Sequence, residues 1–179
     1  RMLLSNEDWE LVRYCPAPLL LVKSKKWNAN PVFLASVDPI HQHDKPASLD
    51  HKIVSSAKDL AAISGGDVHL FHSAFIPPLS GMYSLMADAK KEVGELTELA
   101  GAHGIASSNC HWSSKDIKHA LPEISDQLNV SAVIMGAISR SRLDRILIGN
   151  TAEKVLDQIE CDVLVVKPDQ MPALNTMLL

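Results

Sequence analysis

Short apolar runs without alternation recur along the chain. They are rich in Val, Ile and Leu, and such runs are typical of strands that are buried on both faces of a parallel sheet. We therefore predict strands at Val32–Val37, Val68–Ser73, Val130–Met135 and Val163–Val166, with a fainter candidate at Ser107–Trp112.

Between these runs, apolar residues recur with the period of an α-helix. The stripes run from Leu49 to Ala61, Leu85 to Ala100, Ile117 to Leu128 and Ala152 to Ile159. Pro122 lies inside the third stripe and predicts a kink or a restart there, because proline removes a backbone donor. The alternation over residues 32–167 predicts an α/β fold, a doubly wound five-stranded parallel sheet flanked by helices.

The first 23 residues match the end of this region. Residues 1–23 align without a gap with residues 145–167, at an offset of 144, and the apolar positions stay in register. The identical pairs are Arg1/Arg145, Leu3/Leu147, Asn6/Asn150, Leu20/Leu164, Val22/Val166 and Lys23/Lys167.

A repeat separated by one domain length indicates tandem domains. We expect residues 1–23 to be the last helix and strand of an upstream copy and residues 24–31 to be a linker. Residues 32–168 would then form a complete domain and residues 169–179 a tail, so that the chain is a C-terminal fragment. The alternative is that two unrelated segments each have a helix followed by a strand.

Composition narrows the class of protein. Hydrophobic residues make up 46% and charged residues 21% of the chain, which excludes a disordered or fibrous protein. A net charge of −4 argues against a broad surface for nucleic acid or an anionic membrane, and no apolar run has the length of a membrane span. Three cysteines, far apart and without metal-type spacing, favour a reduced, cytoplasmic setting in which the thiols are small core residues.

Ligand sites of open α/β sheets lie beyond the carboxyl ends of the strands, where the strand order reverses. Val37 and Asp38 end the first predicted strand, and Asp38 either accepts hydrogen bonds from a ligand amine or only turns the chain before Pro39. Met135 and Gly136 end the fourth, and glycine permits a close backbone approach to a ligand.

The segment after Gly136 is basic. Ser139 and Arg140 are followed by Arg142 and Arg145, which suits a phosphate-bearing ligand or, almost as well, a solvated loop. Residues Gly149, Asn150 and Thr151 open the last helix, whose free N–H groups either bind phosphate or are capped by Asn150.

Two further segments have competing interpretations. His41 and His43 are candidate transition-metal ligands, although a plain loop explains them better because no other ligands are obvious. The Ser-Gly-Gly sequence at residues 64–66 is similar to a phosphate loop, but its place at the end of a helix favours a glycine C-cap. No nucleophile elbow, Walker loop or pair of catalytic acids is present.

The glycine spacing after the fourth strand, together with the acid after the first, resembles the nucleotide-binding signature of the universal stress protein family, whose unit is the UspA-like domain. The signature Gly-x2-Gly-x9-Gly-(Ser/Thr) maps onto Gly136, Ser139, Gly149 and Asn150, with Asp38 as the strand-one acid. Ser139 replaces the second glycine and Asn150 replaces the Ser or Thr.

This resemblance implies a Rossmann-like fold, similar to that of the adenine nucleotide alpha hydrolases, and a non-catalytic stress-response module. It would bind a small phosphate-containing ligand, ATP or another nucleotide. The residues implied to bind this ligand are Val37, Asp38, Met135, Gly136, Ser139, Arg140, Gly149, Asn150 and Thr151.

The resemblance also implies antiparallel pairing of final strands, across a homodimer or within a tandem chain. Leu19–Lys23 would then pair with Val163–Lys167. Two other functions remain open. One is a slow ATP hydrolase in which Asp38, or a metal at His41 and His43, orients water. The other is a structural dimerisation module with an empty site.

Overall fold

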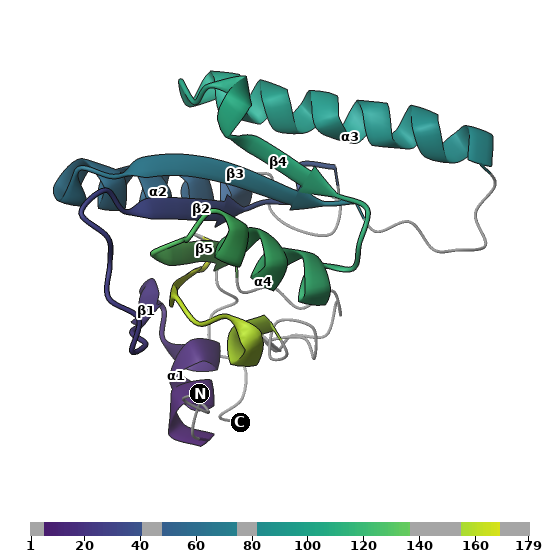
Figure 1. The fold of residues 1–179 in the computed structure, drawn as a ribbon. Coiled ribbons are helices and arrows are strands. Elements are labelled where there is room, and N and C mark those ends of the chain that lie inside the picture. The colour runs from purple at the N-terminus through teal and green to yellow at the C-terminus, as the bar shows by residue number, and fades with distance from the viewer. Residues whose placement is uncertain (1–5, 41–47, 75–81, 137–154, 169–179) are drawn as a thin grey trace.

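A single sheet with helices on both faces organises the computed structural model of the protein (Figure 1). The structure describes residues 6–40, 48–74, 82–136 and 155–168. The strands are β1 (Leu19–Leu21), β2 (Val32–Ser36), β3 (Asp67–Ser73), β4 (Cys110–Ser113), β5 (Ala132–Gly136) and β6 (Asp162–Val166). The helices are α1 (Asn6–Tyr14), α2 (Ser48–Ser64), α3 (Met82–Ala102) and α4 (Ile117–Gln127), and residues 155–158 are also helical.

The strand order is β1-β6-β5-β2-β3-β4. Strands β2 to β6 are parallel, which confirms the predicted five-stranded doubly wound sheet, and β1 adds a sixth, antiparallel strand at one edge. The chain starts this domain at β2, builds outward through β3 and β4, and returns to the other side of β2 with β5. The strand order therefore reverses between β2 and β5.

The predicted strand at Ser107–Trp112 was wrong in its first half. Residues Ser107–Asn109 form a short 3-10 helix, and the strand begins only at Cys110. Of the two outcomes predicted at Pro122, a kink or a restart, the restart does not occur, because α4 runs unbroken through this residue. The backbone N–H that proline lacks would bond the carbonyl of Lys118 in the first turn, so one hydrogen bond is lost and the rest of the helix is kept.

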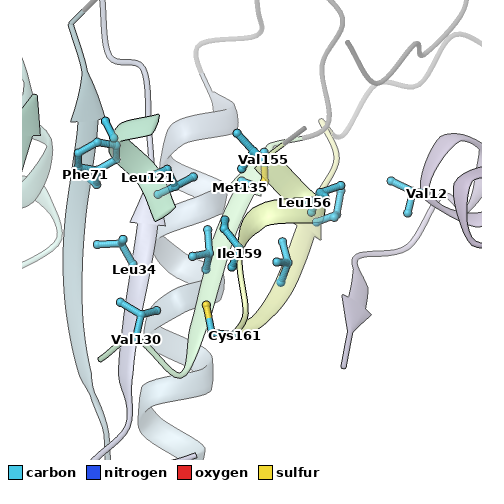
Figure 2. Packing of buried hydrophobic residues seen from close by; sticks show 14 residues of the cluster. Val12, Leu34, Phe71, Leu121, Val130, Met135, Val155, Leu156, Ile159 and Cys161 are labelled. Carbon is cyan, nitrogen blue, oxygen red and sulfur yellow. The ribbon is translucent and has the colours of Figure 1, made fainter. Parts of the chain in front are cut away.

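Each face of the sheet has its own apolar core. On one face α2 and α3 cover β2, β3 and β5, and the buried side chains are Phe33, Ala35, Leu49, Ile53, Val54, Leu70, Leu96 and Ile134. On the other face the cover is α4, the segment 155–159 and α1. Figure 2 shows this second core, in which Val12 of α1 belongs to the same cluster as Leu156 and Ile159. Burial on both faces is the reason that the strands have continuous apolar sequences.

Capping residues mark the start of α4 and the end of α2. Asp116 is the N-cap of α4 and accepts a hydrogen bond of 3.0 Å from the Lys118 N–H. This bond lowers the pKa of the Asp116 carboxyl. Helix α2 ends at Gly65, whose φ of +73° is left-handed, and the N–H groups of Gly65 and Gly66 both donate to the Ala61 carbonyl. The prediction of a glycine C-cap here is confirmed.

Strand β1 pairs with β6 as predicted. Leu20 lies opposite Leu164, Leu19 opposite Val165 and Leu21 opposite Val163. Residues 20 and 164 are also equivalent in the sequence repeat, so the pairing has the register of a local two-fold axis that passes between them. The regular pairing covers Leu19–Leu21, a shorter stretch than the predicted Leu19–Lys23.

Two lysines that are equivalent in the repeat follow the same symmetry. Lys23 donates from Nζ to the carbonyls of Leu156, at 2.5 Å, and Ile159, at the end of the helix in the downstream segment. Lys167 donates to the carbonyl of Cys15, directly after α1. Cys15 and Ile159 are themselves 144 residues apart. Each lysine therefore supplies a positive donor to the carboxyl end of the opposite helix.

The segment between β1 and β2 is hydrogen-bonded to the rest of the fold. The carboxylate of Asp162 accepts hydrogen bonds from the Lys23 backbone N–H, at 2.6 Å, and from Trp27 Nε1, at 2.8 Å. Lys25 donates to the Val130 carbonyl at 3.1 Å. Asp162 is buried, so its two partners also satisfy a carboxylate that has lost its water. These contacts anchor the segment to the start of β6 and to the residue Val130, just before β5.

We expect Lys23→Met to lower the free energy of unfolding by about 1.5–3 kcal/mol, because two helix-terminal carbonyls lose a charged donor. Urea denaturation followed by circular dichroism measures this value. The exposed Lys26 is the matched control, and Lys26→Met should change it by less than about 0.5 kcal/mol. Equal effects of the two substitutions would show that the Lys23 bonds contribute nothing.

Candidate functional site

The candidate site begins where β2 and β5 end side by side. These strands are parallel neighbours, and Ser36 lies opposite Met135. Asp38, two residues after β2, and Gly136, the last residue of β5, therefore lie at the carboxyl ends of the two central strands, at the point where strand order reverses. This is the location that the sequence predicted for a ligand.

Asp38 is held in place by its backbone. Its N–H donates to Oδ1 of Asp50 at 3.2 Å, and Asp50 is a buried residue in the first turn of α2. The preceding N–H, of Val37, donates to the Phe71 carbonyl at 3.0 Å and continues the β2–β3 ladder. The Asp38 side chain remains 30% exposed, so its carboxylate is accessible at a rigid strand end.

Gly136 has a packing role that the sequence did not reveal. A Cβ atom at this position would lie 2.7 Å from Cδ2 of Leu49 and 3.3 Å from Cδ1 of Ile53, both on α2. The absence of a side chain therefore lets α2 pack closely against the end of β5. Its approach to a ligand remains a prediction.

His72 is the residue of this region that sequence reasoning missed. It is the second-last residue of β3 and is 2% exposed. Its Nδ1 lies 3.1 Å from the Val37 carbonyl and 3.8 Å from Oδ1 of Asp38. Its other ring nitrogen, Nε2, is 3.4 Å from Oε2 of Glu92 on α3. A histidine within the apolar run Val68–Ser73 was the available signal, because an imidazole buried in a strand needs polar partners.

The remaining predicted ligand residues, Ser139, Arg140, Gly149, Asn150 and Thr151, lie outside the described residues, as do His41 and His43. The site is therefore described on its β2, β3 and β5 side. Within the described ranges, no three His, Cys, Asp or Glu side chains are grouped so that they could hold a metal ion.

Two histidine pairs lie elsewhere in the fold. His69 Nδ1 and His111 Nε2 are 2.8 Å apart, with ring centroids 5.1 Å apart and an interplanar angle of 9°. His51 and His103 approach to 2.9 Å. In both pairs the two nitrogens lie between the ring centres, so the N–H of one ring can point at the lone pair of the other. This is the geometry of an N–H···N hydrogen bond and leaves no common point for a metal.

A hollow of about 360 Å³ lies at the opposite edge of the sheet, where β3 begins. Lys58, Gly66, Asp67, His103 and Asn109 contribute to its wall. Because Gly66 and Asp67 precede the apolar part of β3, this hollow is separated from Asp38 by the length of the strand. It does not belong to the candidate site.

All three cysteines are free. Cys161 is buried, and burial raises the pKa of its thiol to about 11. Cys15 and Cys110 are only partly buried, so the prediction that all three thiols are core residues was wrong for these two. Among the described helices, none is both long and apolar enough for a membrane span.

Comparison with known proteins identifies the family. The sequence model of the universal stress protein family matches residues 44–167. The chain belongs to the universal stress protein family. The match begins after β2, so Asp38 lies outside the matched residues and its assignment depends on the position of the strand end.

Two relatives of this universal stress protein match nearly all of this chain but only part of their own length. Universal stress protein E of Escherichia coli K12 is 29% identical, and the match covers 91% of this chain but 55% of the relative. A universal stress protein structure from Pseudomonas aeruginosa UCBPP-PA14 is 29% identical, with a TM-score of 0.79. This match covers 93% of this chain and 58% of that one. The chain thus spans little more than half the length of these relatives.

A third relative is similar in fold alone. It is a universal stress protein solved in complex with cAMP, 20% identical with a TM-score of 0.54. The match covers 78% of this chain and 98% of that one, so this relative has the size of a single domain.

We expect Gly136→Ala to cost about 1–3 kcal/mol of folding free energy, because the new methyl group overlaps Leu49. Chemical denaturation of Gly136→Ala, Leu49→Ala and the double variant measures the coupling, and the added cost of Gly136→Ala should shrink in the Leu49→Ala background. Gly94→Ala on α3 is the control, since a Cβ there meets nothing within 4 Å. It should stabilise the protein by up to about 1 kcal/mol. An unchanged cost of Gly136→Ala in the Leu49→Ala background would contradict this packing role.

We expect the stability of the protein to fall on mild acidification. Burial lowers the pKa of His69, His103 and His111, so the fold favours neutral imidazoles. Their contribution is complete above the ordinary value of 6.5 and is lost as the pH falls below it, because burial disfavours the charged imidazolium in the folded protein. Thermal unfolding between pH 7.5 and 5 should show a falling midpoint. The fall should be smaller in His111→Asn, and an identical slope would exclude the His69–His111 pair as its source.

Proposed function

We propose that the protein is a non-catalytic regulatory module that binds a small phosphate-containing ligand, ATP or another nucleotide, beyond the central strands. The observation that carries this proposal is the position of Asp38. Its carboxylate is accessible, its backbone is fixed by Asp50, and it lies at the reversal of strand order beside Gly136. A carboxylate there is suited to accept hydrogen bonds from the exocyclic amine of a base.

Two further considerations support a phosphate-bearing ligand. The sequence after Gly136 contains Arg140, Arg142 and Arg145, which give local positive charge in a chain with a net charge of −4. The universal stress protein solved with cAMP is a relative in fold that holds a nucleotide. The proposed ligand residues are Val37, Asp38, Met135, Gly136, Ser139, Arg140, Gly149, Asn150 and Thr151.

We also propose that residues 1–23 are the end of an upstream copy of the domain, which pairs with this one through β1 and β6. The antiparallel register and the reciprocal lysine contacts support this proposal. Burial supports it too. Leu11 is 53% and Val22 60% exposed, whereas their repeat equivalents Val155 and Val166 are fully buried. An upstream sheet and helix would cover the first pair as the present domain covers the second.

Ligand binding is tested by thermal unfolding with ATP, cAMP and a panel of nucleotide sugars. A ligand present at about 100 times its dissociation constant should stabilise the protein by roughly 2.7 kcal/mol, which raises the midpoint by several degrees. Asp38→Ala should abolish most of the shift, whereas Asp59→Ala, an exposed position on α2, should keep it.

The other outcomes separate the competing functions. Stabilisation by no compound would contradict ligand binding and favour a pairing module with an empty site. Release of phosphate from ATP that depends on added metal and is lost in Asp38→Ala would favour the slow hydrolase. Turnover that is equal in both proteins would come from a contaminant.

A further inference from the structure

His72 lies between the candidate ligand site and helix α3. Its ring is 2% exposed and stands between Asp38, which follows β2, and Glu92 on α3. The two acids face different nitrogens of the imidazole, so they cannot chelate one ion together with it. His72 can, however, carry an electrostatic effect from one acid to the other.

The hydrogen-bond partners fix one proton. A carbonyl oxygen only accepts, so the 3.1 Å contact between Nδ1 and the Val37 carbonyl requires a hydrogen on Nδ1. In a neutral ring Nε2 would then be a bare acceptor. It faces Oε2 of Glu92, also an acceptor when ionised, at 3.4 Å.

If the His72 ring is neutral, no hydrogen lies between its Nε2 and Oε2 of Glu92. His72 Nε2 and Glu92 Oε2 are both buried, and neither has a hydrogen-bond partner within the described part of the chain. Two buried acceptors that face each other are unfavourable, because each has lost water without gaining a donor. One additional proton turns the contact into an ion pair.

The charged groups around the imidazole favour that proton. Glu92 faces it from α3, Asp38 from the end of β2, and Asp50 of α2 lies one step further, bonded to the Asp38 N–H. On the β4 side the register neighbour of His72 is the uncharged Trp112. Within the described ranges, the residues that these contacts and this strand pairing place around the ring are thus acids or uncharged.

We propose that His72 is an imidazolium paired with Glu92, and that it serves as a positioning residue for the ligand site by keeping a positive charge beside Asp38. This role rests on the proposed function. The cation, with Nδ1 3.8 Å from the Asp38 oxygen, attracts that carboxylate and holds it in position as an acceptor for a ligand amine. The cation also offsets the negative charge of Asp38 and Glu92, which would otherwise repel a phosphate-bearing ligand.

The proton is tested without any ligand. A long-range proton–nitrogen NMR spectrum of the imidazoles at pH 7 should show both nitrogens of His72 protonated in the wild-type protein. In Glu92→Gln, which keeps the shape of the side chain, Nε2 should lose its proton while Nδ1 keeps it. Glu98→Gln, exposed on the same helix, should leave the spectrum unchanged. A bare Nε2 in the wild type, or a protonated Nε2 in Glu92→Gln, would overturn the ion pair.

The effect on the site is tested with ATP as the probe, by isothermal titration at pH 7 and low salt. His72→Gln, which retains an amide donor for the Val37 carbonyl, should weaken ATP binding roughly three- to tenfold because the site loses one positive charge. Glu98→Gln should bind as the wild type does. Equal affinity in His72→Gln would overturn the positioning role while leaving the ion pair to the NMR spectrum. Failure of the wild type to bind ATP would instead overturn both the ATP assignment and the role of His72 in it.

Discussion

The hydrogen-bonded contact between β2 and β5 is the constraint on which the rest of the structure depends. The chain extends the sheet from β2 through β3 and β4 on one side and then returns to the other side of β2 with β5. The pairing of β2 with β5 therefore fixes where the strand order reverses. Both are buried on two faces, and α2 packs over them so closely that Gly136 has no room for a side chain. The same contact brings the ends of β2 and β5 together and so defines the candidate site.

A second organising feature is the edge formed by β1 and β6. The pairing centres on Leu20 and Leu164, and the lysines at 23 and 167 each bond the end of the opposite helix. Burial lowers the pKa of Lys167, and its contact with the Cys15 carbonyl compensates in part for the lost water. Asp162 departs from this symmetry, since its repeat equivalent is Pro18, and its carboxylate fastens the segment between β1 and β2 through Trp27.

The candidate site itself combines a rigid framework with an unusual number of acids. Asp38, Asp50 and Glu92 come from three different elements, and His72 is the basic group that lies between two of them. A carboxylate that accepts a hydrogen bond from a ligand also repels the phosphate of that ligand. The proposed positive charge on His72, buried behind Asp38, reduces this repulsion, and it depends on contacts between elements far apart in the sequence.

The sequence by itself determined the fold class, the places of the parallel strands and the repeat between residues 1–23 and 145–167. These features depend on apolar period and on identity at a fixed offset, which can be read along the chain. The pairing of β1 with β6 was predicted from the repeat together with the family resemblance. Sequence reasoning failed at Ser107–Asn109, where three residues carry too little pattern to separate a 3-10 helix from a strand. Only the tertiary structure decided that His72 meets Asp38 and Glu92, that Leu49 occupies the space beside Gly136, and that Lys23 caps a helix more than a hundred residues away. The physical reason is that such contacts arise from packing between distant segments, and no periodicity along the chain records which side chains that packing brings together.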